Sequence, residues 1–262
     1  MAVKKACLLF VILLLWFVGS FARIAFYGDT RSNPEIHKQI VAAIAKHSPQ
    51  IVFHTGDLNS KGTQQSEYDS FLQIILPLSS KSEFWPVRGN HEKSLELFTD
   101  NFPALNGKSY NTLVSDCIRY IILDSVIDLK PGSDQYKWLG TALADSLPKI
   151  VLLHHPVFSS GEHGDELGLQ MYLPQLLSKY SVKAVFSAHD HNYERSLYKD
   201  ITYIVTGGGG APFRNEKHDN PYSIVFNKSN HYLIADRVKS NLEFRVYALD
   251  GSILDSFVLK GF

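Results

Sequence analysis

Residues 51–57 read IVFHTGD, a short run of mainly apolar residues that turns at Gly56 into Asp57. A largely apolar run of this length is typical of a strand buried on both faces, as in a parallel sheet. Four more stretches have the same form, an apolar run followed at once by side chains able to bind metal or phosphate: residues 23–29 (RIAFYGD), 84–91 (FWPVRGNH), 150–155 (IVLLHH) and 184–191 (AVFSAHDH). Because open α/β sheets bind ligands beyond the carboxyl ends of their strands, we expect these five ends to meet in one crevice.

Amphipathic segments between these runs predict helices over residues 32–47, 64–76 and 133–147, with a further helix within residues 166–180. In the first segment, Pro34 stands in the first turn and the apolar residues recur at helical spacing. The second helix is expected to end before Pro77, and the fourth to be bent or interrupted at Pro174, because proline lacks the N–H that a helix interior uses.

The remaining apolar runs predict antiparallel strands. Residues 110–113 pair with 117–123, and residues 232–238, 242–248 and 253–259 are separated by polar turns such as Asp250-Gly251. No linker-like change of composition and no internal repeat divides the chain. We therefore expect one α/β domain over residues 23–262, with a mixed sheet, or two packed sheets, flanked by helices.

Charge and cysteine content exclude several classes of protein. The 262 residues include 26 Lys+Arg and 26 Asp+Glu, a formal net charge of +0 that excludes a strongly basic nucleic-acid binder. Two cysteines, Cys7 and Cys117, rule out a disulfide framework and a four-cysteine zinc site. Cys117 lies in the apolar run CIRYIIL and is expected to be a buried core residue.

The first 22 residues predict a targeting segment. Lys4 and Lys5 precede an apolar run over residues 6–19, followed by Ser20-Phe21-Ala22, which is typical of a secretory signal peptide cleaved after Ala22. The protein is therefore expected to be secreted or periplasmic. The run is shorter than the ~20 residues that a spanning helix needs, and an uncleaved membrane anchor is the alternative.

The side chains at the strand ends form a mixed set of oxygen and nitrogen donors, with two carboxylates, one amide and several imidazoles. Such a set suits Fe, Mn or Zn rather than Ca²⁺ or Mg²⁺. An aspartate with ligands on both sides suggests two ions roughly 3.5–4 Å apart, which can clamp the attacking and leaving oxygens of a phosphoryl displacement. The expected cofactors are therefore two divalent or trivalent metal ions.

In chain order these side chains are Asp29, Gly56-Asp57, Gly89-Asn90-His91-Glu92, His154 and His189-Asp190-His191. Together they resemble the signature of the calcineurin-like metallophosphoesterase superfamily. Residues 189–195 (HDHNYER) and 206–212 (TGGGGAP) are similar to its purple acid phosphatase branch. The resemblance runs from Gly28 to about Phe213 and implies an αββα sandwich of two mixed sheets flanked by helices.

The resemblance also implies a role for each residue. Asp57 would bridge the ions, and the other ligands would divide between them: Asp29 and His191 on the first ion, Asn90, His154 and His189 on the second. His91 would contact the phosphate and donate a proton to the leaving oxygen, with a metal-activated hydroxide as the nucleophile. His163, on the polar loop after His154, would contact the substrate.

The chain departs from the family pattern at two positions. The superfamily reads Asp-x-His at the first motif, but here Arg31 stands in place of the histidine and cannot be a ligand. Purple acid phosphatases supply a tyrosine three residues after the bridging aspartate, and here that residue is Ser60. The first ion therefore lacks one protein ligand, and the purple colour should be absent. Arg31 is expected either to clamp the phosphate or to form a structural ion pair.

Other polar residues are expected to support the centre. His54 is expected to be a hydrogen-bonded core residue, and His155 to support a ligand or face the substrate. Asp190 is expected to orient the paired histidine rings. Tyr193 and Arg195 are expected to brace the same loop.

The resemblance implies an exported, metal-dependent phosphatase acting on a small phosphate ester, with no nucleic-acid partner and contact with a membrane only if the leader is retained. One alternative is a phosphodiesterase acting on nucleotides or lipid head groups. Another is a metal-binding or phosphate-binding module with impaired catalysis, an interpretation motivated by Arg31 and Ser60.

Overall fold

The computed structural model describes residues 23–262, and the predicted signal peptide lies outside the described residues. Within residues 23–262, no helix combines the length and the apolar character needed to cross a bilayer.

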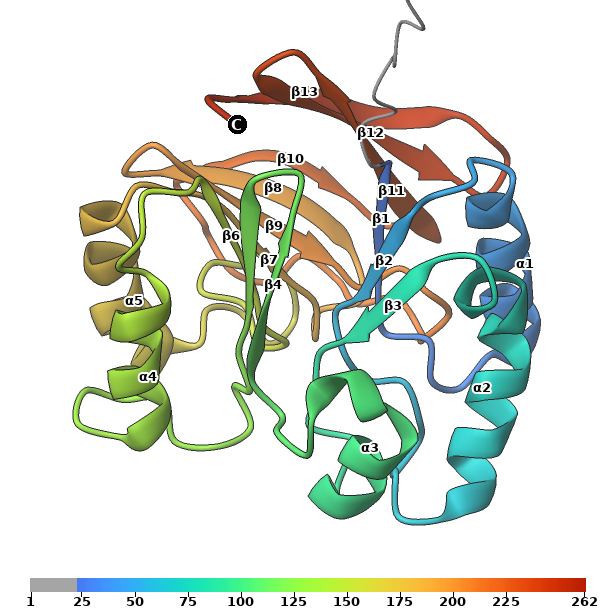
Figure 1. Cartoon of the computed structure of the whole chain (residues 1–262). Helices are drawn as coiled ribbons and strands as arrows, with labels where there is room; N and C mark the ends of the chain where they lie inside the picture. The colour runs from blue at the N-terminus through green and yellow to red at the C-terminus, as the bar shows by residue number, and fades with distance from the viewer. Residues whose placement is uncertain (1–22) are drawn as a thin grey trace, which may run out of the picture.

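Two mixed β-sheets lie face to face in the middle of the molecule (Figure 1). The first has the strand order β13-β12-β11-β1-β2-β3 and the second the order β10-β8-β9-β7-β6-β5-β4. The first sheet consists of β1 (Ile24–Tyr27), β2 (Ile51–His54), β3 (Glu83–Pro86), β11 (His231–Val238), β12 (Asn241–Ala248) and β13 (Ile253–Lys260). The second consists of β4 (Asn111–Ser115), β5 (Ile118–Ile122), β6 (Lys149–Leu152), β7 (Val182–Ser187), β8 (Tyr193–Tyr198), β9 (Ile201–Thr206) and β10 (Ser223–Asn227).

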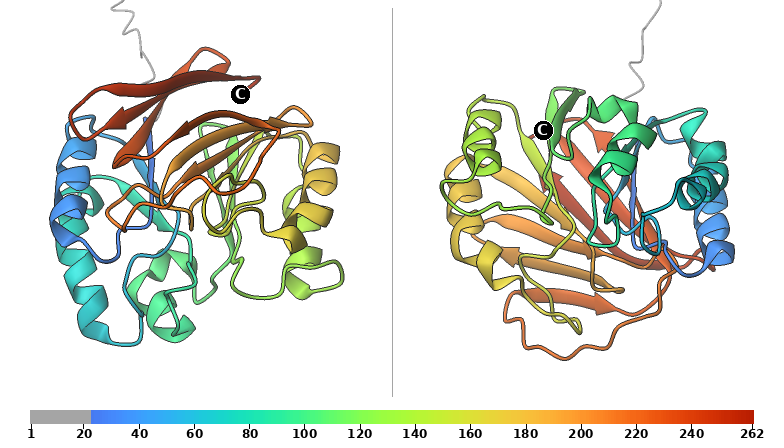
Figure 2. Two further views of the ribbon diagram at one scale, coloured as in Figure 1. Left: turned by 180° about the vertical axis from the view of Figure 1, so that it is seen from behind. Right: turned by 90° about the horizontal axis from the view of Figure 1, so that it is seen from below.

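Helices cover the outer face of each sheet. Helices α1 (Pro34–Ala45) and α2 (Gln65–Ser79) lie against the first sheet, and α4 (Asp134–Ala142) and α5 (Leu167–Lys179) lie against the second (Figure 2). Helix α3 (Leu95–Asn101) and the 3₁₀ helix η1 (Pro103–Leu105) follow β3. The fold is therefore an αββα sandwich, as expected.

Side-chain alternation along the strands explains the layers. In β1, Ile24 and Phe26 face the core between the sheets, whereas Ala25 and Tyr27 face the core beneath α1 and α2. The ring of Phe26 stacks on that of Phe186 in β7, with centroids 4.1 Å apart, and so joins the two sheets. Both faces of the central strands are largely buried, which is why these strands are mainly apolar.

The parallel part of each sheet brings the carboxyl ends of its strands together. Strands β1, β2 and β3 are parallel to one another, as are β5, β6, β7 and β9. The five strands predicted at the metal-binding motifs are all present, as are the three strands of the tail. Strands β8 and β10 and helix α3 were not predicted.

Several predicted boundaries were wrong. Helix α2 passes through Pro77 to Ser79, because the buried Leu78 anchors its last turn in the core beneath α1 and α2. Helix α5 likewise continues through Pro174, and α4 ends at Ala142 rather than at residue 147. Cys117 is exposed, not buried: it lies with Asp116 in a two-residue turn before β5, where both residues have positive φ (48° and 58°).

Candidate metal centre

The turns that follow five of the parallel strands lie together, although they are far apart in the sequence. After β1, β2, β3, β6 and β7 these turns carry Asp29, Asp57, Asn90, His154 and His189 respectively. Backbone hydrogen bonds join neighbouring turns: Asp29 N donates to Gly56 O (3.0 Å), and Ala188 N donates to His154 O (2.9 Å). The His154 Nδ1–Thr55 O hydrogen bond (2.9 Å) joins the turn after β6 to the turn after β2, so both sheets contribute to one site, as the strand-end pattern predicts.

One group of side chains surrounds Asp57. Asp29, Asp57 and His154 are buried, and each offers a ligand atom within 4.8 Å of the others. Asp57 Oδ1 lies 3.3 Å from His154 Nε2, and Asn90 Oδ1 lies 3.1 Å from the same nitrogen. The ring centroids of His154 and His189 are 5.2 Å apart. The structure thus brings together the four residues expected around the second ion.

The other expected ligands lie on the Asp29 side of the site. Asp29 Oδ1 is 3.8 Å from His191 Nε2, while Asp29 Oδ2 accepts a hydrogen bond from the backbone N–H of His189 (2.8 Å). Within residues 23–262, the buried Asp29 Oδ1 has no hydrogen-bond partner. A buried carboxylate oxygen without a donor favours a bound cation.

Backbone carbonyls determine which imidazole nitrogens are free. The Nδ1 of His154 donates to Thr55 O (2.9 Å), and the Nδ1 of His191 donates to Pro212 O (2.5 Å). Since a carbonyl only accepts, each Nδ1 carries a proton, and in the neutral ring Nε2 keeps its lone pair. In both histidines Nε2 is the atom that faces the aspartates.

Burial and neighbouring charges shift the pKa values of these side chains. Burial lowers the pKa of His154 and His189, and lowers that of His191 to about 4, while the charge of Asp57 opposes the shift at His154. Burial acts to raise the pKa of Asp57, but positive charge at His154 and His91, the backbone N–H of His91 and the charge of Arg31 outweigh it, and the pKa lies below its ordinary value. His154 Nε2 and Asp57 Oδ1, 3.3 Å apart, therefore compete for one positive charge, which a metal ion between them would supply.

Asp29 adds a second buried carboxyl group. Its burial, and next the charge of Asp57, raise the pKa of Asp29 well above its ordinary value. A cation between the two aspartates would remove this repulsion and would accept the lone pairs of the neutral imidazoles. The side chains present therefore fit a metal ion, and the group of Asp29, Asp57 and His154 could hold one.

The backbone is strained at three of the expected ligands. Asp29, Asp57 and His189 have φ values of 55°, 55° and 70°, in the left-handed region that L residues rarely adopt. Glycines let other backbone segments approach these residues: a Cβ on Gly89 would lie 2.2 Å from Asp57 Oδ1, and one on Gly207 would lie 2.4 Å from Asp29 Oδ2. The glycine-rich stretch after β9 therefore passes directly beside the site.

Arg31 forms an ion pair inside the site. Its Nε donates to Asp57 Oδ2 (3.1 Å), and its Nη2 lies 3.4 Å from His191 Nε2. Of the two alternatives for Arg31, the ion pair is the one seen. Ser60 contacts the site through its backbone carbonyl, which accepts a hydrogen bond from His91 Nδ1 (2.5 Å). On the Asp29 side, a guanidinium thus stands where the family pattern has a histidine ligand.

Three further histidines line the site. His91 Nε2 is 3.8 Å from Asp57 Oδ2, and the His91 side chain is 27% exposed, so it can meet a substrate from solvent. The rings of His163 and His155 lie beside that of His189, with centroids 4.2 Å and 4.5 Å away. The Nδ1 of His155 contacts Ser125 Oγ at 2.9 Å.

Glu92 has a structural role that was not predicted, although it stands in the Gly-Asn-His-Glu motif. It is fully buried, and its carboxylate accepts hydrogen bonds from the backbone N–H groups of Gly89 (2.9 Å), Asp57 (3.1 Å) and Asn59 (3.0 Å). Burial, and next the charge of Asp57, raise the pKa of Glu92 to about 8. Glu92 therefore ties the turn after β3 to the turn after β2, and the only signal for this role in the sequence was the place of this acid at the end of the motif.

The expectation for Asp190 was wrong. Its carboxylate does not bind the histidine rings but accepts hydrogen bonds from Ser159 Oγ (2.6 Å), His163 N (3.0 Å) and Gly164 N (3.3 Å). Asp190 therefore holds the loop that carries His163 against the site. His54 is a buried core residue as expected, and its Nδ1 accepts a hydrogen bond from Gly56 N (3.2 Å).

Tyr193 and Arg195 do not brace the histidine loop. Tyr193 Oη donates to Asp255 Oδ2 (2.7 Å) and Arg195 Nε donates to the same oxygen (2.6 Å). Because Asp255 lies in β13, these bonds tie the second sheet to the first.

Known proteins are similar to this chain in sequence and fold. The model of the calcineurin-like phosphoesterase family matches residues 22–193. The chain is 30% identical over 220 residues to "Probable purple acid phosphatase 20" of Arabidopsis thaliana, which covers 72% of this chain and 51% of that protein. It is 26% identical over 229 residues to "Probable inactive purple acid phosphatase 24" of the same plant, covering 68% of this chain and 36% of that protein. The chain thus spans about half or less of the length of these curated relatives.

A solved structure supports the same architecture. The purple acid phosphatase PPD1 from yellow lupin (Lupinus luteus) seeds matches with a TM-score of 0.77 at 21% sequence identity, over 91% of this chain and 53% of that one. At this identity the match shows the fold. Since the family model covers well over half of the 262 residues, this chain belongs to the calcineurin-like phosphoesterase family.

Proposed function

We propose that this protein is an exported, metal-dependent phosphatase that hydrolyses small phosphate monoesters. One observation carries the proposal: His154 Nε2 and Asp57 Oδ1 lie 3.3 Å apart in a buried site, with the ring proton on the opposite nitrogen. A cation between them would stabilise such a pair. The family membership and the half-exposed rim at His91 support a site that acts on phosphate esters.

The proposed centre holds two ions, with Asp57 shared between them. Asp29 and His191 would hold the first, and Asn90, His154 and His189 the second. When bound, the ions supply a water activated for attack and positive charge opposite the phosphate oxygens.

Side chains at the rim would handle the substrate. The Ser60 carbonyl fixes the Nδ1 proton of His91 and leaves Nε2 free to gain a proton and pass it to the leaving alcohol. Arg31 would contact the phosphate through guanidinium N–H groups beside those that contact Asp57 and His191. His163, held by Asp190, would contact the substrate from the other side of His189.

A second candidate is a metal-binding or phosphate-binding module with impaired catalysis. The ion pair of Arg31 with Asp57 favours it, because a guanidinium beside the shared aspartate opposes a metal ion on the Asp29 side. Three relatives are named as probable inactive purple acid phosphatases, which is consistent with this alternative.

Hydrolysis assays separate the candidates. Metal-supplemented protein is expected to hydrolyse 4-nitrophenyl phosphate faster than its bis-ester, and His91→Ala is expected to lower kcat by about 10²- to 10⁴-fold. His47→Ala, at a histidine that contacts Tyr232 instead of the site, is the matched control. Preference for the bis-ester would indicate a phosphodiesterase, and metal binding without turnover of either ester would indicate the binding module. Fractionation of expressing cells tests the proposed export.

A further inference from the structure

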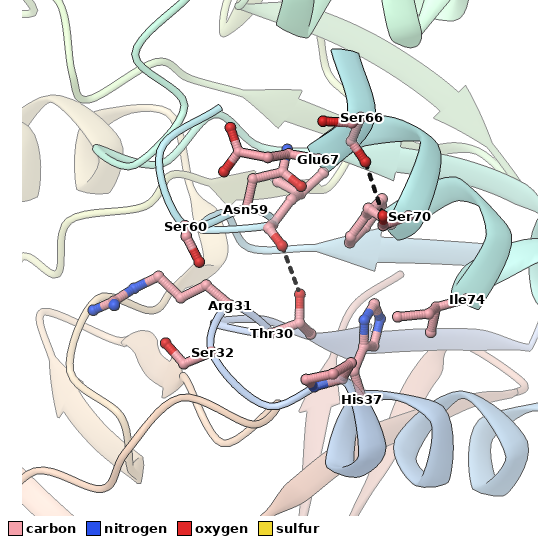
Figure 3. Close-up of a pocket in the computed structure, with 13 residues that line it drawn as sticks. Thr30, Arg31, Ser32, His37, Asn59, Ser60, Ser66, Glu67, Ser70 and Ile74 are labelled. Atoms are coloured by element: carbon pink, nitrogen blue, oxygen red, sulfur yellow. Dashed lines mark hydrogen bonds between the residues drawn. The ribbon is translucent and has the colours of Figure 1, made fainter. Parts of the chain in front are cut away.

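A cavity of about 340 Å³ adjoins the metal centre and has no role in the proposed hydrolysis. It lies between the turn after β1, the turn after β2 and the facing sides of α1 and α2 (Figure 3). We call it the α1–α2 pocket and define it by six lining residues: Arg31, Ser60, Ser66, Ser70, Phe71 and Ile74. Its volume is in the range of small-molecule sites.

Two residues belong both to this pocket and to the metal centre. Arg31 lines the pocket while its Nε contacts Asp57 Oδ2 at 3.1 Å. Ser60 lines the pocket while its carbonyl contacts His91 Nδ1 at 2.5 Å. The pocket therefore begins on the side of the centre where His91 would release the alcohol of a phosphate ester.

The walls of the pocket combine hydroxyl groups with an apolar surface. The serines at positions 60, 66 and 70 are exposed, and Figure 3 shows Ser66 and Ser70 on α2 across from Thr30 and Arg31. Leu58 and Phe71 are buried in the wall, and Ile74 is half-buried beside them. A ligand with hydroxyl groups along one edge and an apolar face would match these walls.

The charges of the lining residues disfavour an anionic ligand. The Glu67 carboxylate also lines the pocket, and it accepts hydrogen bonds from the backbone N–H groups of Lys61 (2.9 Å) and Thr63 (3.0 Å). These bonds hold the carboxylate in place, so it repels an anionic group in the pocket. Arg31, the one cation among the lining residues, is already paired with Asp57. An uncharged ligand is therefore favoured over one with a second phosphate or a carboxylate.

We propose that the α1–α2 pocket binds the alcohol part of the phosphate ester, an uncharged, hydroxyl-bearing group with one apolar face. This inference rests on the proposed function, since it takes the phosphate to lie at the metal centre. Adenosine and its 5′-monophosphate are suitable probes because ribose supplies the hydroxyl groups and the base supplies the apolar face.

Filling the pocket tests the proposal. Ser70→Trp and Ile74→Trp each place an indole at a lining position of α2, and neither replaces a group of the metal centre. Both variants are expected to raise KM for adenosine 5′-monophosphate by about tenfold or more and to leave kcat/KM for methyl phosphate within about twofold of wild type. Leu76→Trp is the matched control, because Leu76 is 59% exposed on the same helix and does not line the pocket. Equal effects on the two esters, or no effect of either filling variant, would overturn the proposal.

A binding measurement separates this proposal from the proposed function. Adenosine carries no phosphate, so its binding to metal-free protein, measured by saturation-transfer NMR, reports on the pocket alone. Binding at millimolar concentrations to wild type and to Leu76→Trp, weakened in both filling variants, would support the pocket even if no ester were hydrolysed. An absence of adenosine binding to wild-type protein would overturn the pocket proposal even if 4-nitrophenyl phosphate were hydrolysed.

Discussion

Replacing Arg31 by methionine should change metal binding and phosphate binding in opposite directions. Arg31→Met keeps most of the side-chain length but removes a charge that lies 3.1 Å from Asp57 Oδ2 with only 15% of the side chain exposed. At an effective dielectric constant of about 20, a unit charge about 5 Å from a divalent ion repels it by several kcal/mol. Allowing for screening by water, we expect a gain of about 1.5–3 kcal/mol, or metal binding about 10- to 100-fold tighter. Phosphate loses a charge-assisted donor and should bind about tenfold more weakly.

Two titrations measure these changes. Metal-free protein is titrated with Zn²⁺ or Mn²⁺ by calorimetry, and the metal-loaded protein is then titrated with inorganic phosphate. Arg119→Met is the matched control, because Arg119 is also partly buried (22% exposed) and paired with an aspartate, Asp145, but lies in β5 away from the site. Weaker metal binding by Arg31→Met would show that Arg31 supports the ion and would refute the electrostatic reasoning.

Three further experiments test an ion pair between the sheets, a close backbone approach to Asp57 and the exposure of a thiol. Asp255→Asn should lower the free energy of unfolding by about 2 kcal/mol, because it breaks the ion pair between the sheets that Asp255 (8% exposed) forms with Arg195 (16% exposed). Hydrogen bonds from Arg195 and Tyr193 outweigh burial and lower the pKa of Asp255 below 3.8, so this difference should stay constant above about pH 5 and shrink as the pH falls below 3.8. Urea denaturation checks both, with Asp219→Asn as the control because Asp219 is exposed, and a difference that grows at low pH would contradict the assignment. Gly89→Ala should weaken metal binding in calorimetric titrations, since the added Cβ would lie 2.2 Å from Asp57 Oδ1. Gly140→Ala is the control and should bind metal as the wild type does, because a Cβ on Gly140 would have no atom within 4 Å. Equal metal binding by both variants would contradict the close approach at Gly89. The exposed Cys117 thiol should react with iodoacetamide in the folded protein, as read by mass spectrometry of its peptide, and protection until unfolding would show that it is buried.

The sequence predicted the central strands and the convergence of their ends because both depend on local pattern. An apolar run with polar residues directly after it identifies a buried strand and its carboxyl end, as at residues 51–57. The topology of a parallel sheet then brings Asp29 and Asp57 together without any knowledge of distant contacts.

Other features depend on partners that are remote in the sequence. Strand β8 (Tyr193–Tyr198) was missed because it buries polar residues: Glu194 is 1% exposed, and its carboxylate binds the backbone N–H and hydroxyl of Ser160. The contacts of Asp190 and Asp255 likewise come from loops or strands that no local pattern connects to them. Helix α2 continues past Pro77 because tertiary packing of Leu78 outweighs the local effect of proline.

The ion pair of Arg31 could be given only as one of two alternatives. The residue type indicated a cation near the site, but phosphate and Asp57 are both suitable anions for a guanidinium. Only the relative placement of the turns after β1 and β2 shows that Asp57 is within reach.

Metal content tests the central assignment most directly. Wild-type protein and Asp57→Asn, purified in parallel after incubation with Fe, Mn and Zn, are compared by inductively coupled plasma mass spectrometry. The proposed centre predicts two bound ions per chain in wild type and a clear loss in Asp57→Asn, since Asp57 lies next to His154 on one side and Arg31 on the other. Wild-type protein that binds no ion, or an Asp57→Asn variant that retains the full metal content, would contradict it.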